Sequence, residues 1–264
     1  SDWPARRIAE IATQRFDRQY PSMMDSDIPK VMDPDHLLSL LPDRVDLPRG
    51  RSALSEAEVS QSRNARIQQA VIDEVAASGF HKATVAAITK RARISRTSFY
   101  QEFDDKEEAF AAAHRTASDL ALELVWGPVL TQAEGDLEDR VRIALETYVA
   151  AIESNPAFGC CFFIEIRGAG ERLLQVRDEM LDRHARILSD LVAVGAKSDP
   201  NLIDPGADQL LGVLGALDEL MARELRAQAG AESLNVGGVI VPFIQVLLAV
   251  ARGPRSDAGV ERFG

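Results

Sequence analysis

Residues Thr84 to Phe103 read TVAAITKRARISRTSFYQEF, and this stretch decides the fold. Apolar side chains recur every three or four positions after Thr84, which is typical of a helix with that threonine as its N-cap. A tight turn at 93–95 leads to a second helix of about two turns, capped by Ser95. Because this second helix opens with small polar residues and one arginine, its end fits a major groove about 12 Å wide. The stretch predicts a helix-turn-helix.

The preceding residues complete a three-helix head. Apolar residues four apart predict a helix over Asn64–Ser78, and Gly79 ends it as a C′ glycine does. We expect a separate helix to begin near Glu56, with Ser55 as its cap.

The chain remains helical beyond the head. Asp105, with Glu108 three residues later, has the spacing of a capping box and starts a long helix that reaches about Trp126. Little reads as strand, so we predict an all-α fold: the helix-turn-helix head plus a C-terminal helical domain for ligand binding and dimerisation. The further helices are expected over Leu137–Glu153, Cys161–Arg167, Glu171–Val194, Ala207–Ala229 and Val236–Ala251.

Four parts follow from this pattern: an N-terminal extension (1–60), the head (61–110), the ligand-binding and dimerisation domain (111–252) and a flexible tail (253–264). The extension contains one amphipathic helix followed by loops. Its role has two readings: it packs on the sensing domain of its own or the partner subunit, or its arginines form a minor-groove arm.

Net charge bears directly on function, because a protein that binds phosphates needs cations. The whole chain carries −11, but residues 60–114 hold eight Lys and Arg against seven Asp and Glu, which gives +1 there and −12 elsewhere. A local basic patch can therefore bind DNA while the rest stays acidic. No apolar run reaches about 18 residues and no secretory signal opens the chain, so we expect no membrane span and a cytoplasmic protein.

The sequence contains few features that would indicate an enzyme. The chain lacks a nucleophile-elbow, Walker or dinucleotide-binding motif and a Cys/His metal spacing, so we expect no catalytic residues, no metal and no cofactor. Cys160, Glu165 and His184 would form a catalytic set only by an accident of folding. The adjacent Cys160 and Cys161 are read as reduced, semi-buried thiols, with a redox switch as the alternative. A helical adaptor whose head binds protein is the remaining rival.

The head resembles the tetracycline-repressor (TetR) family of transcriptional regulators. The most specific feature of the match is the spacing from Phe99-Tyr100 through Phe103 to Asp105-Lys106-Glu107, which combines aromatic residues, a helix cap and charges in order. The matching positions are Ile67, Ala70, Gly79-Phe80, Thr84-Val85, Ile88, Ala92, Ile94-Ser95, Phe99-Tyr100, Phe103 and Asp105-Lys106-Glu107. The chain departs from the family at Arg93, where a glycine is usual in the turn, and at Thr97-Ser98, where Gly-Thr is common. A left-handed conformation at Arg93 would be mildly strained.

The resemblance and the chemistry together imply roles in DNA binding. Thr84 and Lys106 stand at helix N-termini that favour a phosphate, and Tyr100 and Lys106 look like the family's phosphate clamps. Contacts with base edges are expected from the start of the second helix, where Arg96 can donate two hydrogen bonds to a guanine. The predicted DNA-binding residues are Thr84, Lys90, Arg93, Ser95, Arg96, Thr97, Ser98, Tyr100 and Lys106. Arg91 is a further non-specific candidate.

The family also implies a homodimer on a palindromic operator, commonly a repressor that a small, partly apolar molecule releases. One apolar stripe (Leu210, Leu211, Leu214, Leu217 and Met221) and a second (Val239, Ile240, Phe243, Leu247 and Val250) are candidates for the dimer interface or, alternatively, for packing inside one subunit. The candidate ligand-binding residues are Trp126, Tyr148, Phe158, Phe162, Phe163, Glu165 and His184.

Overall fold

The computed structural model describes residues 56–126, 129, 135–230 and 233–253. Within these ranges the chain is helical and contains no strand, which confirms the predicted all-α class. The predicted extension up to residue 55 and the tail beyond Gly253, with the roles suggested for them, lie outside the described residues.

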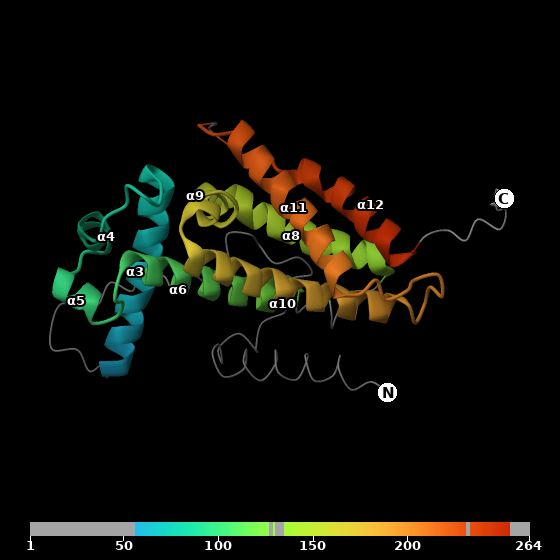
Figure 1. Ribbon diagram of the computed structural model, residues 1–264, viewed down its shortest axis with the longest axis horizontal. Helices are drawn as coiled ribbons and strands as arrows, with labels where there is room; N and C mark the ends of the chain where they lie inside the picture. Colours follow the sequence, from blue (N-terminus) through green and yellow to red (C-terminus); the bar gives the residue numbers. More distant parts are fainter. Residues whose placement is uncertain (1–55, 127–128, 130–134, 231–232, 254–264) are drawn as a thin grey trace, which may run out of the picture.

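The head stands at one end of the molecule (Figure 1) and consists of α3 (Glu56–Ser78), α4 (Val85–Ala92) and α5 (Arg96–Tyr100). Their shared core is fully buried around Ile67, Val75 and Ile88. The expectation of two helices before Gly79 was wrong: α3 is continuous, because neither glycine nor proline interrupts the sequence from Glu56 to Ser78.

Helix α6 (Lys106–Ala121) runs from the head into the body (Figure 1). Asp105 caps it, and the carboxylate of Glu108 accepts a hydrogen bond from the backbone of Asp104, one residue further back than a capping box requires. The helix ends in a π turn, η2 (Leu122–Trp126), so the predicted reach to Trp126 is confirmed with a change of winding.

The body is a bundle of α8 (Leu137–Ser154), α9 (Pro156–Phe163), α10 (Glu171–Gly195), α11 (Ala207–Ala227) and α12 (Ile240–Ala251), with the short turns η3 (Glu165–Gly168) and η4 (Gly237–Val239). Helix α10 packs against α6 and α11, and α12 packs against α8 and α11 (Figure 1). The predicted helices thus exist, with ends shifted by a few residues.

The expected helix over Cys161–Arg167 is the exception. The helix begins at Pro156, where the side chain of Asn155 accepts a hydrogen bond from Phe158 N at 3.2 Å and proline occupies the first turn. It ends at Phe163, and the chain then forms the separate 3-10 turn η3.

The two apolar stripes proposed for dimerisation pack mostly inside the subunit. Leu210, Leu214 and Met221 are buried on α11, as are Phe243 and Leu247 on α12, so the interface prediction is wrong for these side chains. The alternative of packing within one subunit is the correct one for them.

The described part of the chain contains neither a single membrane-spanning helix nor a metal-binding cluster. No single helix there is long and apolar enough to cross a bilayer, and only α8 together with Pro156–Gly168, bent by 109°, reaches that composition as a pair. The same residues contain no cluster of His, Cys, Asp or Glu suited to a metal ion.

Candidate DNA-binding surface and sensing body

Two caps and one left-handed residue fix the turn between α4 and α5. Thr84 Oγ1 accepts a hydrogen bond from Ala87 N at 3.2 Å, and Ser95 Oγ accepts one from Ser98 N at 3.0 Å, as predicted. Arg93 has φ 55° and ψ 47° and donates its N–H to the carbonyl of Lys90. The turn therefore requires the left-handed region, and this chain places an arginine where glycine would be unstrained.

Buried aromatic rings orient α5. Phe99 is fully buried, and its ring centroid lies 6.1 Å from that of Phe103 and 5.4 Å from that of Tyr100. Tyr100 itself remains 56% exposed. Because α5 is only five residues long, this anchor, rather than its own hydrogen bonds, holds it in place.

Most predicted DNA-binding residues are exposed along α4, the turn and α5. Their cations have no ion pair with any described residue, which leaves them free for phosphates or bases. The exposed members are Thr84, Lys90, Arg93, Ser95, Arg96, Thr97 and Tyr100, whereas Ser98 is half-buried with its hydroxyl 2.8 Å from that of Ser95.

Lys106 is placed differently from the others. Its ammonium group donates to the carbonyls of Phe80 at 2.7 Å and Ala83 at 2.9 Å, and it lies 4.5 Å from the centroid of the Phe80 ring. The side chain thus fastens the loop between α3 and α4. A phosphate contact by Lys106 stays a prediction, and it would require these bonds to be exchanged.

Two exposed residues next to the predicted site were missed. His81 and Lys82 lie in the loop just before Thr84, and Lys82 has no ion pair with the described residues. The basic pair directly before a helix cap was the available signal. Arg91, in contrast, is bound to Glu74 at 3.0 Å and serves to join α4 to α3.

The predicted ligand residues do not form one wall. Tyr148 lies edge-on to Phe163 with centroids 6.3 Å apart, and burial raises the pKa of its hydroxyl above the usual value. Trp126 and His184 make a separate pair, also 6.3 Å apart, and burial lowers the pKa of His184. These two pairs belong to separate packed clusters of the body, and a ligand contact by either stays a prediction.

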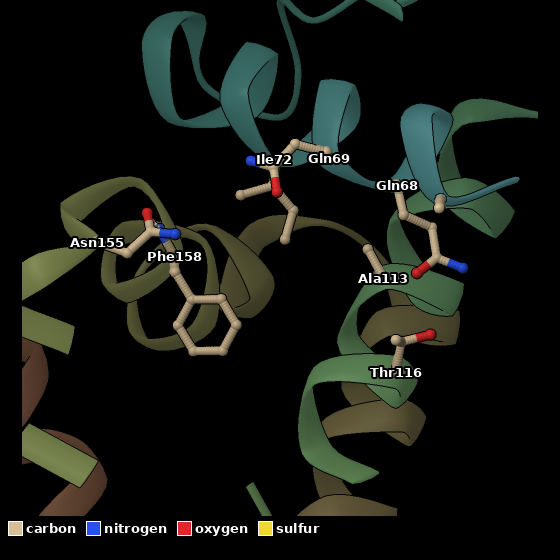
Figure 2. A pocket seen from close by; sticks show the side chains of 8 residues that line it. Gln68, Gln69, Ile72, Ala113, Thr116, Asn155 and Phe158 are labelled. Carbon is tan, nitrogen blue, oxygen red and sulfur yellow. Dashed lines mark hydrogen bonds between the residues drawn. The ribbon is translucent and has the colours of Figure 1, made fainter. Parts of the chain in front are cut away.

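Phe158 faces a narrow cleft between α3, α6 and α9 (Figure 2), lined also by Gln68, Ile72 and Thr116. Its open volume of about 20 Å³ has room for a water molecule or two. The cleft therefore lies at the boundary between head and body, which we call the seam.

A continuous row of rings crosses that seam. Phe80 in the head stacks on Phe110 of α6 with centroids 5.4 Å apart, Phe110 meets His114 at 4.4 Å, His114 stacks on Phe162 at 4.2 Å, and Phe162 stacks on Phe158 at 4.0 Å. His114 is 1% exposed, and burial lowers its pKa to about 4. The imidazole is thus neutral at physiological pH and packs as part of the core.

Glu165 also faces the head. Its Oε2 accepts a hydrogen bond from the backbone N–H of Phe80 at 2.7 Å. The carboxylate therefore joins the body to the loop before α4, a use that its sequence position did not reveal.

The cysteines are poorly suited to redox sensing. Cys161 is fully buried, its thiol donates to the Ile72 carbonyl at 3.3 Å, and burial raises the pKa of both cysteines. Because the thiolate is the reactive form, this environment favours the reduced, structural reading.

Comparison with known proteins identifies the head. Residues 70–113 match the family model described as bacterial regulatory proteins, tetR family. The matched residues include α4, the turn and α5, so the helix-turn-helix described above is similar to that of the tetR family. No curated protein matches the sequence.

Solved structures extend the likeness to the body. The fatty acid degradation regulator FadR of Bacillus halodurans superposes with a TM-score of 0.61 at 17% identity, covering 71% of this chain and 95% of its own. FadR of Bacillus subtilis, solved with stearoyl-CoA, gives 0.61 at 15% identity, with coverage of 70% and 97%. A TetR-family regulator of Syntrophomonas wolfei gives 0.57 at 15%, with coverage of 73% and 96%. At these identities the likeness shows a shared fold.

The left-handed turn can be tested by substitution. We expect Arg93→Gly to keep or raise the free energy of unfolding by up to about 1 kcal/mol, because glycine adopts this backbone without strain. Arg93→Val should lower it by about 1–2 kcal/mol, since a β-branched residue fits the left-handed region poorly. Urea unfolding at one protein concentration measures both. Equal midpoints for the two variants would contradict the assigned turn.

The buried His114 predicts a pH dependence of stability. Its folded pKa of about 4 lies below the value of about 6.5 expected in the unfolded chain, so the unfolded state binds the proton first as pH falls. Stability should drop by about 2 kcal/mol between pH 7.5 and pH 5 from this group alone. His114→Gln should lose that part of the slope. An unchanged slope in the variant would show that the imidazole is not held neutral.

Proposed function

We propose that this TetR-family regulator is a homodimeric repressor that binds a palindromic operator and is released by a small, partly apolar molecule. The observation that carries the proposal is the Ser95-capped start of α5, where Arg96 and Thr97 are exposed. Lys90 and Arg93, which have no ion pair with the described residues, lie on α4 and in the turn. Small polar residues at this end let the helix approach base edges, and the neighbouring cations supply phosphate contacts.

Dimerisation is part of the proposal, because one helix of five residues reads too few bases alone. Two heads would bind half-sites about 34–36 Å apart. The exposed sides of α11 and α12 carry apolar and small residues, which we call the outer apolar face and propose as the dimer interface. It consists of Leu211, Gly212, Gly215, Val241, Pro242 and Val246. Space is open around both glycines, so a second copy can approach closely.

The effector proposal draws on the body and on the structural neighbours. Two apolar clusters, one around Tyr148 and Phe163 and one around Trp126 and His184, suit a partly apolar molecule. The FadR of Bacillus subtilis has this fold and was solved with stearoyl-CoA. A long-chain acyl thioester is therefore the first effector to test. It must bind the DNA-free state more tightly than the DNA-bound state to act.

Substitutions on the head separate base reading from phosphate binding. After selection of a bound site from genomic DNA, Arg96→Ala should weaken binding by about 1–3 kcal/mol and relax preference at one base pair. Lys90→Ala should weaken binding to all sequences and reduce the salt slope by about one counterion. Fluorescence titration over a salt series measures both effects.

Controls for this titration lie in the same protein. Arg115→Ala removes an exposed arginine of α6, paired with Glu179, and should leave DNA affinity unchanged. If Arg96→Ala combined with Tyr100→Ala captures genomic DNA as tightly as the unaltered protein, the proposed DNA surface is wrong. Stearoyl-CoA added to the same titration tests the effector: release of DNA supports it, and unchanged affinity removes acyl thioesters from the proposal.

The outer apolar face predicts the oligomeric state. Val241→Arg with Val246→Arg should convert a dimer into a monomer, because these side chains are 53% and 43% exposed and charge would be buried between copies. Light scattering after size exclusion measures the mass. Leu174→Arg, which alters a comparably exposed leucine at the start of α10, is the control and should leave the mass unchanged. A dimer in the double variant would place the interface elsewhere.

A further inference from the structure

Three successive residues of the 3-10 turn η3 contact three different parts of the protein: the head, the core of the body and α11. Ile166 is fully buried and anchors the turn in the body. On one side of it Glu165 accepts the N–H of Phe80 in the head at 2.7 Å. On the other side Arg167 reaches α11, where it pairs with Asp218 at 2.9 Å and Glu219 at 2.6 Å. The turn thus joins the head to α11 through three short polar contacts, one to the head and two to α11.

The head end of η3 acts on the start of α4. The loop from Gly79 to Ala83 contacts the carboxylate of Glu165 and the ammonium of Lys106, which donates to three of its carbonyls. Gly79 has φ +82°, so a side chain here would be strained by the backbone conformation alone. The cap of α4 follows directly after this loop. Glu165 therefore contacts the loop that leads directly into the first helix of the helix-turn-helix.

At the other end of η3, Arg167 is bound by the buried carboxylate of Asp218. Asp218 is 3% exposed and carries a second guanidinium, that of Arg177 from α10. Glu219 is shared in turn with Arg226 at 3.0 Å. A buried carboxylate is costly without its cations, so separating Arg167 from Asp218 is unfavourable. Since η3 carries both Arg167 and Glu165, it connects α11 to the loop before α4.

We infer that η3 is a strap that couples α11 to the DNA-binding head, as a route separate from α6. Glu165 and Arg167 are its positioning residues. The coupling within the protein is independent of DNA, whereas its consequence, a change in operator affinity, rests on the proposed function. Helix α11 packs in the body on one side and bears the outer apolar face on the other. The strap would therefore report changes at either surface to the head.

Hydrogen exchange tests the coupling without DNA. In the full chain, Arg167→Ala should speed exchange of the amides in 79–83 by about three- to tenfold, although the altered residue does not touch them. Glu165→Ala should speed the same amides at least as much, whereas Glu165→Gln keeps an acceptor for Phe80 N–H and should restore most of the protection. Arg115→Ala, which breaks an exposed pair between α6 and α10, is the matched control and should change nothing.

The result that overturns the strap is protection of 79–83 within twofold of the unaltered protein in Arg167→Ala while the variant stays folded by circular dichroism. If Arg167→Ala fails to fold, Arg167→Lys replaces it. Lysine keeps the charge but cannot bind both carboxylates at once, so it should give a smaller increase in the exchange rate of the same amides. DNA affinity is then measured on the same variants. Absence of DNA binding in every protein, the unaltered one included, rejects the proposed function and leaves the exchange result intact.

Discussion

The loop between α3 and α4 is held by two opposite charges. The ammonium of Lys106 donates hydrogen bonds to three of its carbonyls, and the carboxylate of Glu165 accepts one from the N–H of Phe80. A head of three helices has a small core of its own and depends on such contacts for a fixed orientation. Because the loop ends at the cap of α4, these bonds set where the helix-turn-helix begins relative to α6 and to the body. The row of rings from Phe80 to Phe158 adds apolar packing to the same seam.

Much of the head could be predicted because its helix caps involve residues that are close together in the sequence. The caps at Thr84 and Ser95 depend on a hydroxyl and an N–H three residues later, so the sequence contains both partners. The left-handed turn at Arg93 could be expected only from the resemblance, because the family usually has a glycine there. The helix predicted from Cys161 begins earlier, at Pro156, because Asn155 caps it and the proline fits its first turn.

Tertiary partners explain what the sequence could not show. Lys106 resembles a phosphate-binding residue by position, yet the carbonyls that hold it are more than twenty residues away. Glu165 is 85 residues from the N–H that it accepts. The stripes on α11 and α12 were ambiguous for a related reason: both sides of α11 carry apolar residues, and periodicity does not tell which side meets the subunit's own core. Leu210 turned out to be buried and its neighbour Leu211 exposed.

Ion pairing reconciles an acidic chain with a DNA-binding role. Within the head, Glu74 is bound to Arg91, and Glu102 to Arg63 and Ser60, while Asp105 and Glu108 are used as caps of α6. These carboxylates are thus neutralised or committed to backbone N–H groups. The cations on the other elements, Lys82, Lys90, Arg93 and Arg96, meet no acid among the described residues. Since exposed charges more than a Debye length apart are screened, about 8 Å at physiological salt, a phosphate at α5 would sense these cations far more than the acidic body. Net charge alone therefore says little about where a polyanion can bind, and the pairing of each charge decides it.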